Sequence, residues 1–224
     1  MKTRVSCLAF LLLSAPFLRA QTTTWDGGGD GVSWHDPLNW SGNAVPGAND
    51  DVLIPPSIAT NVYCQGSQPA VRSLVNHAIL WLRGGASGPA ALSVSGDFTN
   101  HGTIRLQTIA GGWDDSVNVG GTLLNASDGS FEVYPGTGGE RYLTANIVNQ
   151  GVFNIASGKD LYAHGAGKVF RQEAGSINAT NLFTWAGGRF DFVGGRLTGW
   201  VAVRSGSLDV AATAGDATVI CAEN

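Results

Sequence analysis

Five acidic side chains and one arginine gather in the middle of the chain. They are Asp114, Asp115, Asp128, Glu132, Glu140 and Arg141. Enzymes that cleave polysaccharides use a pair of carboxyl groups on one face of the fold, so this set could form the site of a polysaccharide lyase or hydrolase. The alternative, which we favour, is that acidic residues in the turns of an acidic protein are solvated. We therefore assign no catalytic residue.

Aromatic side chains in or near turns offer a second kind of chemistry. Trp113, Tyr134, Tyr142 and Tyr162 lie in the same region of the sequence, and an exposed aromatic ring presents an apolar face on which a sugar ring can stack. We predict Trp113, Tyr134 and Tyr142 as ligand-binding residues for an extracellular glycan. Packing of the same rings along the edges of the fold is an equally consistent interpretation.

Carboxylates separated by glycine occur near the N-terminus, where residues 26–31 read DGGGDG. Oxygen ligands of this kind suit Ca²⁺, so Asp26 and Asp30 are candidate metal ligands and calcium is the candidate cofactor. The spacing does not match a full EF-hand loop, because no glutamate stands at its closing position. A tight turn fits better, with glycine at positive φ and aspartate accepting hydrogen bonds from backbone N–H groups.

No other motif predicts a cofactor or a catalytic group. The four histidines, His35, His77, His101 and His164, show no zinc-binding spacing. His77 and His101 occupy equivalent repeat positions 24 residues apart and could stack on each other. The sequence contains no Gly-x-Ser-x-Gly motif and no phosphate-binding or dinucleotide-binding glycine motif.

The elements that would position these side chains come from a repeat over residues 70–210. Short segments of alternating apolar and polar residues follow Asn or Gly, and matching positions lie 24 residues apart (Asn76 and Asn100) or 22 apart (Gly129 and Gly151). Alternation with period 2 predicts strands with one buried and one solvated face. This repeat length predicts a solenoid of about six coils, since a propeller blade needs about 40 residues or more. A β-sandwich is the alternative.

Composition agrees with an all-β chain that does not bind nucleic acid. Glycine accounts for 32 of the 224 residues, charged residues for only 13%, and the net charge is −4. Glycine disfavours helices, and a nucleic-acid-binding protein needs a basic surface.

Three of the seven tryptophans, Trp25, Trp34 and Trp40, fall close together near the N-terminus. We expect their rings to pack on one another over the end of the core, with the indole N–H groups hydrogen-bonded at its rim. The predicted divisions of the mature chain are a Trp/Gly/Asp-rich cap over residues 21–69 and β-helical repeats over residues 70–224. The last residues read as the start of another strand, so we expect the repeats to be truncated there.

The first twenty residues predict a secretory signal peptide. Lys2 and Arg4 precede the apolar run Cys7–Leu13, and we place cleavage after Ala20. The apolar run is too short to span a bilayer, and the mature chain has no membrane-spanning segment. We therefore predict a secreted, extracellular or cell-surface protein, in which Cys64 and Cys221 could pair.

The quoted motifs resemble those of bacterial secreted and surface proteins, namely autotransporter-like or haemagglutinin-like adhesins. The resemblance is carried by W-D-G-G-G-D-G-x-S-W-x-D-P-x-N-W at residues 25–40, by V-P-G-A-N-D-D-V-x-I-P at 45–55, and by the segments at 71–74 and 92–104. It implies export, a right-handed parallel β-helix and adhesion or surface attachment, and it brings no catalytic set.

The sequence thus predicts a non-enzymatic β-helix segment with a structural or adhesive role in a bacterial envelope protein. Its expected partner is an extracellular glycan or a surface protein, with no nucleic acid. A carbohydrate-active β-helix enzyme or a glycan-binding module is the alternative. The fold class that both share is all-β, a solenoid with an N-terminal Trp-rich cap.

Overall fold

The computed structural model describes residues 22–57 and 61–212. The predicted signal peptide with its cleavage site, Cys221, and the predicted C-terminal truncation lie outside the described residues. Within the described part, no helix is long and apolar enough to cross a membrane. Cys64 is buried, forms no disulfide with a described residue, and its burial raises the pKa of its thiol.

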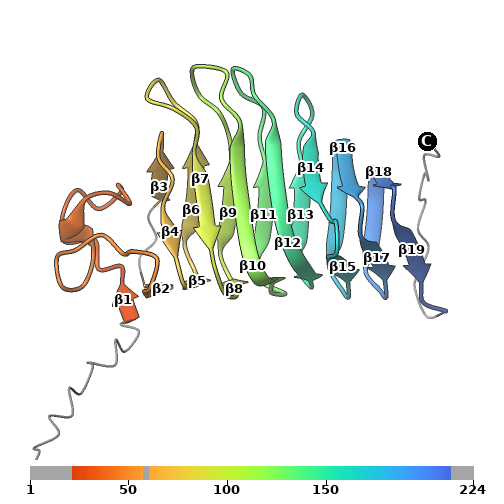
Figure 1. Ribbon diagram of the computed structural model, residues 1–224, viewed down its shortest axis with the longest axis horizontal. Helices are drawn as coiled ribbons and strands as arrows, with labels where there is room; N and C mark the ends of the chain where they lie inside the picture. The colour runs from red at the N-terminus through yellow and green to blue at the C-terminus, as the bar shows by residue number, and fades with distance from the viewer. Residues whose placement is uncertain (1–21, 58–60, 213–224) are drawn as a thin grey trace, which may run out of the picture.

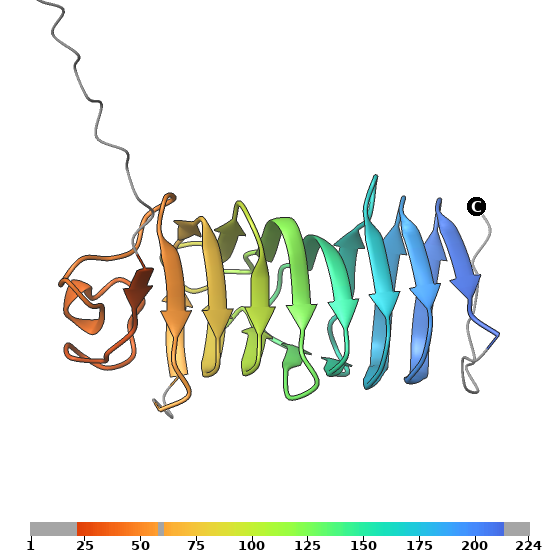
Figure 2. The ribbon, with the colours of Figure 1, turned by 90° about the horizontal axis from the view of Figure 1, so that it is seen from below.

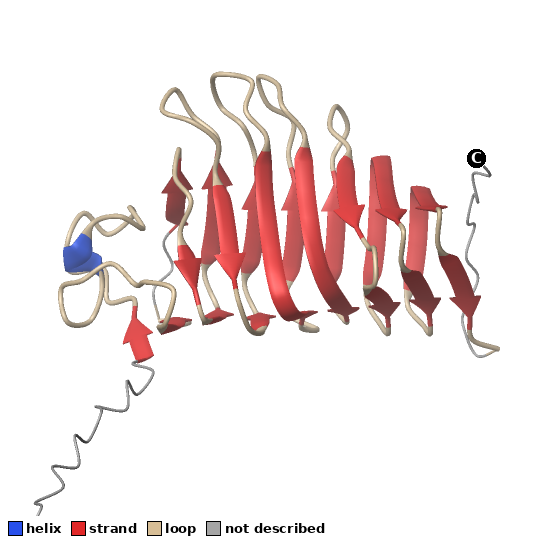
Figure 3. Ribbon diagram, viewed as in Figure 1, coloured by secondary structure: helices blue, strands red, loops and turns tan. Residues whose placement is uncertain are grey.

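The described chain is an all-β solenoid of about six turns, built from strands that pair in parallel. Each turn contributes a strand to each of three faces, which we name A, B and C. The only helix among the described residues is the 3₁₀ turn η1 (Pro37–Asn39), at the N-terminal end (Figure 3). The view from below shows the turns stacked along one axis (Figure 2).

The pairing defines the members of each face. Face A contains β1 (Thr22–Thr24), β2 (Asp51–Ile54), β5 (Ser73–Asn76), β8 (Phe98–Asn100), the second halves of β10 (Asp115–Asn125) and β12 (Arg141–Asn149), β15 (Val169–Gln172), β17 (Arg189–Phe192) and β19 (Ser207–Val210). Face B contains β3 (Asn61–Gln65), β6 (Ile79–Arg83), β9 (Thr103–Leu106), β11 (Ser130–Val133), β13 (Val152–Ile155) and the first halves of β16 (Ser176–Ala186) and β18 (Arg196–Arg204). Face C contains β4 (Ala70–Val71), β7 (Ala91–Val94), the first halves of β10 and β12, β14 (Leu161–His164) and the second halves of β16 and β18.

The long loops of the solenoid gather at one edge, where face B passes into face C. They join β6 to β7, β9 to β10, β11 to β12 and β13 to β14, at the top of Figure 1. In the later turns β16 and β18 each run from face B into face C as one strand. We call this side of the solenoid the B–C edge.

The core is a column of apolar side chains that project inward from successive turns. On face B, Leu80, Ile104, Phe131, Phe153 and Ile177 are completely buried and follow one another in register. The rings of Phe131 and Phe153 stack with their centroids 4.8 Å apart. The predicted alternation of buried and solvated positions is therefore confirmed, and so is the solenoid.

A buried ladder of side-chain amides runs along the end of face A. Asn76, Asn100, Asn125, Asn149 and Gln172 are completely buried, and the Nδ2 of each asparagine donates to the side-chain oxygen of the next rung at 2.8 Å. Each Nδ2 also donates to backbone carbonyl oxygens of the adjoining turn, such as Asn100 to the carbonyl of Ser130 at 3.1 Å. The repeat asparagines thus point inward, and each pairs its amide both with the next rung and with backbone carbonyl oxygens of the corner, so that no polar atom of the amide is buried unpaired.

Glycine lies two residues after Asn100 and Asn149 because the preceding turn passes too close for a side chain. A Cβ at Gly102 would lie 2.2 Å from the carbonyl oxygen of Ala78, and one at Gly151 would lie 2.2 Å from that of Gly129. The recurrence of Asn followed by Gly therefore reflects one tight corner that is stacked from turn to turn.

The Trp-rich segment lies at the N-terminal end of the solenoid (Figure 1). Trp25, Trp34 and Trp40 are completely buried and belong to the same core as the strands. The ring of Trp40 meets Trp25 edge-on at 5.0 Å and Trp34 at 4.7 Å. Of the expected hydrogen bonds only that of Trp40 forms, whose Nε1 donates to the carbonyl of Trp34 at 2.7 Å. The other two indole N–H groups have no partner among the described residues. All three rings lie inside the core rather than at its rim.

Asn100→Ala should destabilise the chain by about 2–6 kcal/mol, since at least two buried polar groups lose a partner at about 1–3 kcal/mol each. Urea unfolding measures this change. The matched control is Asn154→Ala on the outer side of β13, where a solvated position should change stability by less than about 0.5 kcal/mol. Equal effects of the two substitutions would contradict a structural role of the amide ladder.

Candidate functional site

The acidic residues singled out by the sequence occupy three separate places. Glu132 lies on the outer side of face B, where its Oε2 accepts from the Nε and Nη2 of Arg105 at 2.9 and 2.7 Å. Asp128 lies in the turn after face A and contacts the Nδ1 of His101 at 2.9 Å. That contact lowers the pKa of Asp128. The remaining members come together at the B–C edge.

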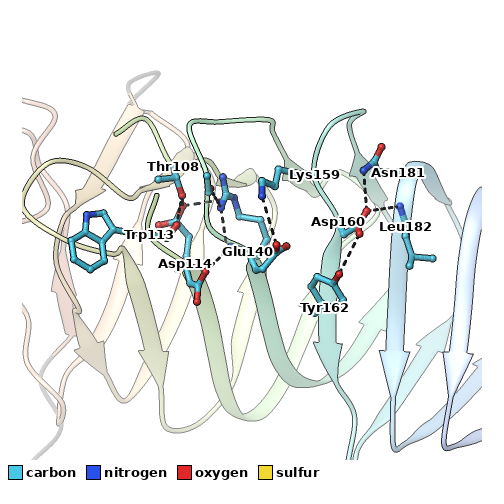
Figure 4. A network of polar contacts seen from close by, with 12 residues as sticks. Thr108, Trp113, Asp114, Glu140, Lys159, Asp160, Tyr162, Asn181 and Leu182 are labelled. Atoms are coloured by element: carbon cyan, nitrogen blue, oxygen red, sulfur yellow. Dashed lines mark hydrogen bonds and ion pairs between the residues drawn. The ribbon is translucent and has the colours of Figure 1, made fainter. Parts of the chain in front are cut away.

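Asp114 and Glu140 meet at the B–C edge, at the top of face C (Figure 4). The Oδ1 of Asp114 accepts from the backbone N–H of Glu140 at 2.6 Å, and the carboxylate of Glu140 lies 3.8 Å from the Nζ of Lys159. One turn further on, Asp160 accepts from the backbone N–H of Leu182 at 3.0 Å. These contacts place three carboxylates from consecutive loops along one edge.

Asp115 and Arg141 form an ion pair inside this edge. Both side chains are completely buried, and the Nε of Arg141 lies 3.7 Å from the Oδ2 of Asp115. Asp115 also accepts from the backbone N–H of Ala90 at 3.0 Å and from the hydroxyl of Thr108 at 2.8 Å. Burial raises the pKa of Asp115, while these donors and the guanidinium oppose the shift. Neither charged group of this pair reaches a ligand in solvent.

Aromatic side chains line face C below this edge. Tyr142 and Tyr162 occupy the same register position in neighbouring turns, with ring centroids 6.0 Å apart, and His164 stacks on Tyr142 at 5.3 Å. Burial, and then the nearby carboxylates of Asp114 and Glu140, raise the pKa of Tyr142. The tyrosines and the acids of this edge therefore belong to one surface, which we call the edge site.

The other two predicted glycan-binding residues lie apart from Tyr142. Trp113 is 43% exposed and projects from the loop between β9 and β10, with its ring pointing away from Glu140 (Figure 4). Tyr134 lies on face B, where the Cζ of Arg105 is 4.6 Å from its ring centroid. The predicted set of three thus spans two faces and one loop.

Sequence reasoning did not single out Lys159, Asp160 or His164 as members of this site. Period-2 alternation could have placed His164 beside Tyr162, because residues two apart project from the same side of β14. Lys159 and Asp160 lie in a loop, where no periodicity reports which residue of the preceding loop they meet.

Two hollows in the surface of the described chain carry no carboxylate. One of 320 Å³ is lined mainly by small side chains, among them Ser93, Asn118 and Thr144, with Lys168 at one end. The other, of 660 Å³, lies over stacked glycine turns beside Lys168 and Arg189. Neither hollow offers the pair of carboxyl groups that hydrolysis of a glycosidic bond requires.

Asp26 and Asp30 lie in a loop held together by its own backbone. The Oδ1 of Asp30 accepts from the backbone N–H groups of Val32 and Ser33 at 2.9 and 2.8 Å, and from the Nδ2 of Asn39 at 2.7 Å. Asp26 accepts from the backbone N–H of Gly28 at 3.1 Å. The described residues contain no group of three or more His, Cys, Asp or Glu that could hold a metal ion. These bonds are the ones that the tight-turn interpretation predicts.

The comparisons with known proteins add no assignment: no protein-family model, no curated protein and no solved structure matches this chain. The resemblance to bacterial adhesins is supported as far as the solenoid fold. Function must therefore be argued from the outer surface of the solenoid itself.

Arg141→Met should destabilise the chain by about 3–5 kcal/mol, because it leaves Asp115 buried without its counter-ion. Urea unfolding of Arg141→Met, Asp115→Leu and the double variant measures the coupling. The double variant should recover part of the lost stability, since no unpaired charge then remains inside the edge, while the backbone N–H of Ala90 still loses its acceptor. A double variant no more stable than Arg141→Met would argue against a coupled pair.

The N-terminal loop should lose stability in acid through Asp30. The backbone N–H of Ser33, then that of Val32, then the amide of Asn39 lower the pKa of Asp30 below its usual 3.8. The carboxylate therefore stabilises the folded chain above that value, and the contribution disappears as the pH falls through the folded-state pKa.

Thermal melts between about pH 5 and pH 2 test this, because Asp30→Asn should make the loss of stability in acid shallower. Asp26→Asn, which removes the charge from a group with one N–H donor, is the comparison. The same melts with calcium or a chelator examine the metal hypothesis. A Tm that rises with calcium, and no longer does so in Asp30→Asn, would favour calcium over the tight turn.

Proposed function

We propose that this chain is a non-enzymatic, secreted or cell-surface β-helix segment with a structural or adhesive role in a bacterial envelope protein. The observation that carries this proposal is the burial of Asp115. A general acid needs a raised pKa and access to its substrate. Asp115 has the raised pKa but is sealed inside the B–C edge with Arg141.

Extended display is the mechanism we propose. Side chains on the outer faces are held by strands whose inner sides are packed into one core. The edge site then presents Tyr142 and Tyr162 for stacking, with Asp114 and Glu140 beside them as hydrogen-bond acceptors. This combination suits a polyhydroxylated partner, so we propose an extracellular glycan in preference to a surface protein.

A carbohydrate-active enzyme is the second candidate, and one observation favours it. Asp114 and Glu140 come from neighbouring loops at the solvent-facing part of the edge, where the Asp114 carboxylate accepts from the backbone N–H of Glu140 and both lie near Tyr142. If these two carboxylates served as acid and base, cleavage would depend on both of them.

The full chain should bind neutral extracellular polysaccharides in a panel without shortening them. Retention on immobilised polymer measures binding, and release of reducing ends measures cleavage. Tyr142→Ala should weaken binding by about tenfold, as expected for loss of about 1.4 kcal/mol of contact. The matched control, Asn154→Ala on face B, should leave binding unchanged. Cleavage that is abolished by Asp114→Asn or Glu140→Gln would replace the structural proposal with the enzymatic one.

A further inference from the structure

We propose that the outer surface of face B binds an anionic polysaccharide, a polymer of carboxylate-bearing sugars. The inference rests on the proposed adhesive function, because it names the chemistry of the partner. The site is separate from the edge site. It consists of Tyr63, Trp81, Arg83, Arg105 and Tyr134, which we call the Tyr–Arg strip.

Strand register builds the strip from four successive turns, the last of which contributes Tyr134 directly after β11. Tyr63 of β3 pairs with Trp81 of β6, and Trp81 pairs with Arg105 of β9. Leu80 and Leu82, the neighbours of Trp81, are completely buried. Because side chains alternate along a strand, Trp81 and Arg83 must both project outward.

Guanidinium groups and aromatic rings alternate along the strip. The Cζ of Arg83 lies 4.4 Å from the ring centroid of Tyr63 and 5.0 Å from that of Trp81. The Cζ of Arg105 lies 4.9 Å from the centroid of Trp81 and 4.6 Å from that of Tyr134. Stacking of this kind uses the flat face of a guanidinium and fixes its orientation, while its N–H groups lie in the plane and remain able to donate.

The two arginines differ in how their charge is balanced. Arg105 donates two hydrogen bonds to Glu132. The side chain of Arg83 forms no hydrogen bond and no ion pair with any described residue. Its Nε, like the Nε1 of Trp81, is buried without a partner, so the terminal Nη groups are the donors that an external anion can reach. A fixed cation with unused donors, on a chain of net charge −4, is a place where an anion from outside is attracted and hydrogen-bonded.

The chemistry around Arg83 favours an acidic sugar polymer. A carboxylate can accept from the guanidinium edge, and the adjoining rings of Tyr63 and Trp81 offer apolar surface to a sugar ring. Gln65 pairs with Arg83 in register and adds an amide for hydroxyl groups. Nucleic acid fits less well, because its binding depends on neutralising many phosphates and the strip has one arginine without a carboxylate partner.

Binding of the full chain to three uronic-acid polymers, polygalacturonate, alginate and hyaluronan, tests the proposal. The chain should bind at least one, more weakly as salt is raised, and should not bind its carboxyl-reduced form. Arg83→Gln should lower the affinity by about tenfold or more, the usual loss for one charge-assisted contact. Arg83→Lys should keep part of it. The matched control is Arg196→Gln, an exposed arginine in the β18 part of face B without an ion pair to a described residue, which should bind as the unmodified chain does.

If Arg83 has only a structural role, Arg83→Gln will change the melting temperature and leave the affinity for the polymer unchanged. That result would overturn the proposal. So would equal binding of the carboxyl-reduced polymer, binding to none of the three polymers, or competition by single-stranded DNA at the same concentration. If Tyr142→Ala loses binding to neutral glycans while Arg83→Gln has no effect on binding to any polymer, the proposed anion site on the Tyr–Arg strip is rejected. The proposed adhesive function is then still supported. Cleavage of any polymer would overturn the adhesive function, whatever Arg83→Gln does.

Discussion

Each turn of the solenoid from Asn76 to Gln172 is tied to the next through one buried side-chain amide. An amide can satisfy its own donors and acceptors inside a core only if its partner lies at the same corner of the neighbouring turn, since unpaired buried groups cost about 1–3 kcal/mol. The four links of the ladder join residues 24, 25, 24 and 23 positions apart. Near-constant turn length is thus a consequence of the ladder.

The shape of the molecule changes where the ladder ends. Gln172 is its last rung, and the next residues at this corner are Phe192 and Val210. With no amide to satisfy, the turns there are shorter, and β16 and β18 run from face B to face C without a long loop. The loops with Trp113, Glu140 and Lys159 therefore belong to the ladder turns, and so does the Tyr–Arg strip.

The period-2 alternation and the repeat length made the solenoid predictable from the sequence. Features that do not repeat, such as the loops of the edge site, could not be predicted in this way. Alternation and the interval between glycines depend on local geometry that every turn repeats. The alternation also places Asn125, two residues after the buried Leu123, on the inside, but the polarity of asparagine argues for solvent unless a stacked partner is known. The environment of the Trp25 indole N–H could not be predicted either, because the groups around it come from segments distant in sequence. The edge site depends on loops such as the one that brings Lys159 to Glu140, and loops have no period to read.

A parallel solenoid repeats its outer positions at the spacing of paired strands, about 4.8 Å. Side chains held at such positions lose little conformational freedom on binding, which lowers the entropic cost of association. A polymer with its own short repeat can then contact several turns at once, whereas a small ligand meets only one. Both proposed surfaces follow this logic, with tyrosines and carboxylates on face C and stacked arginines on face B. They differ in charge, because Asp114, Glu140 and Asp160 make the edge acidic while Arg83 leaves the strip with a cation that no described side chain neutralises. On these two proposals, one solenoid would select differently charged polymers on two of its faces.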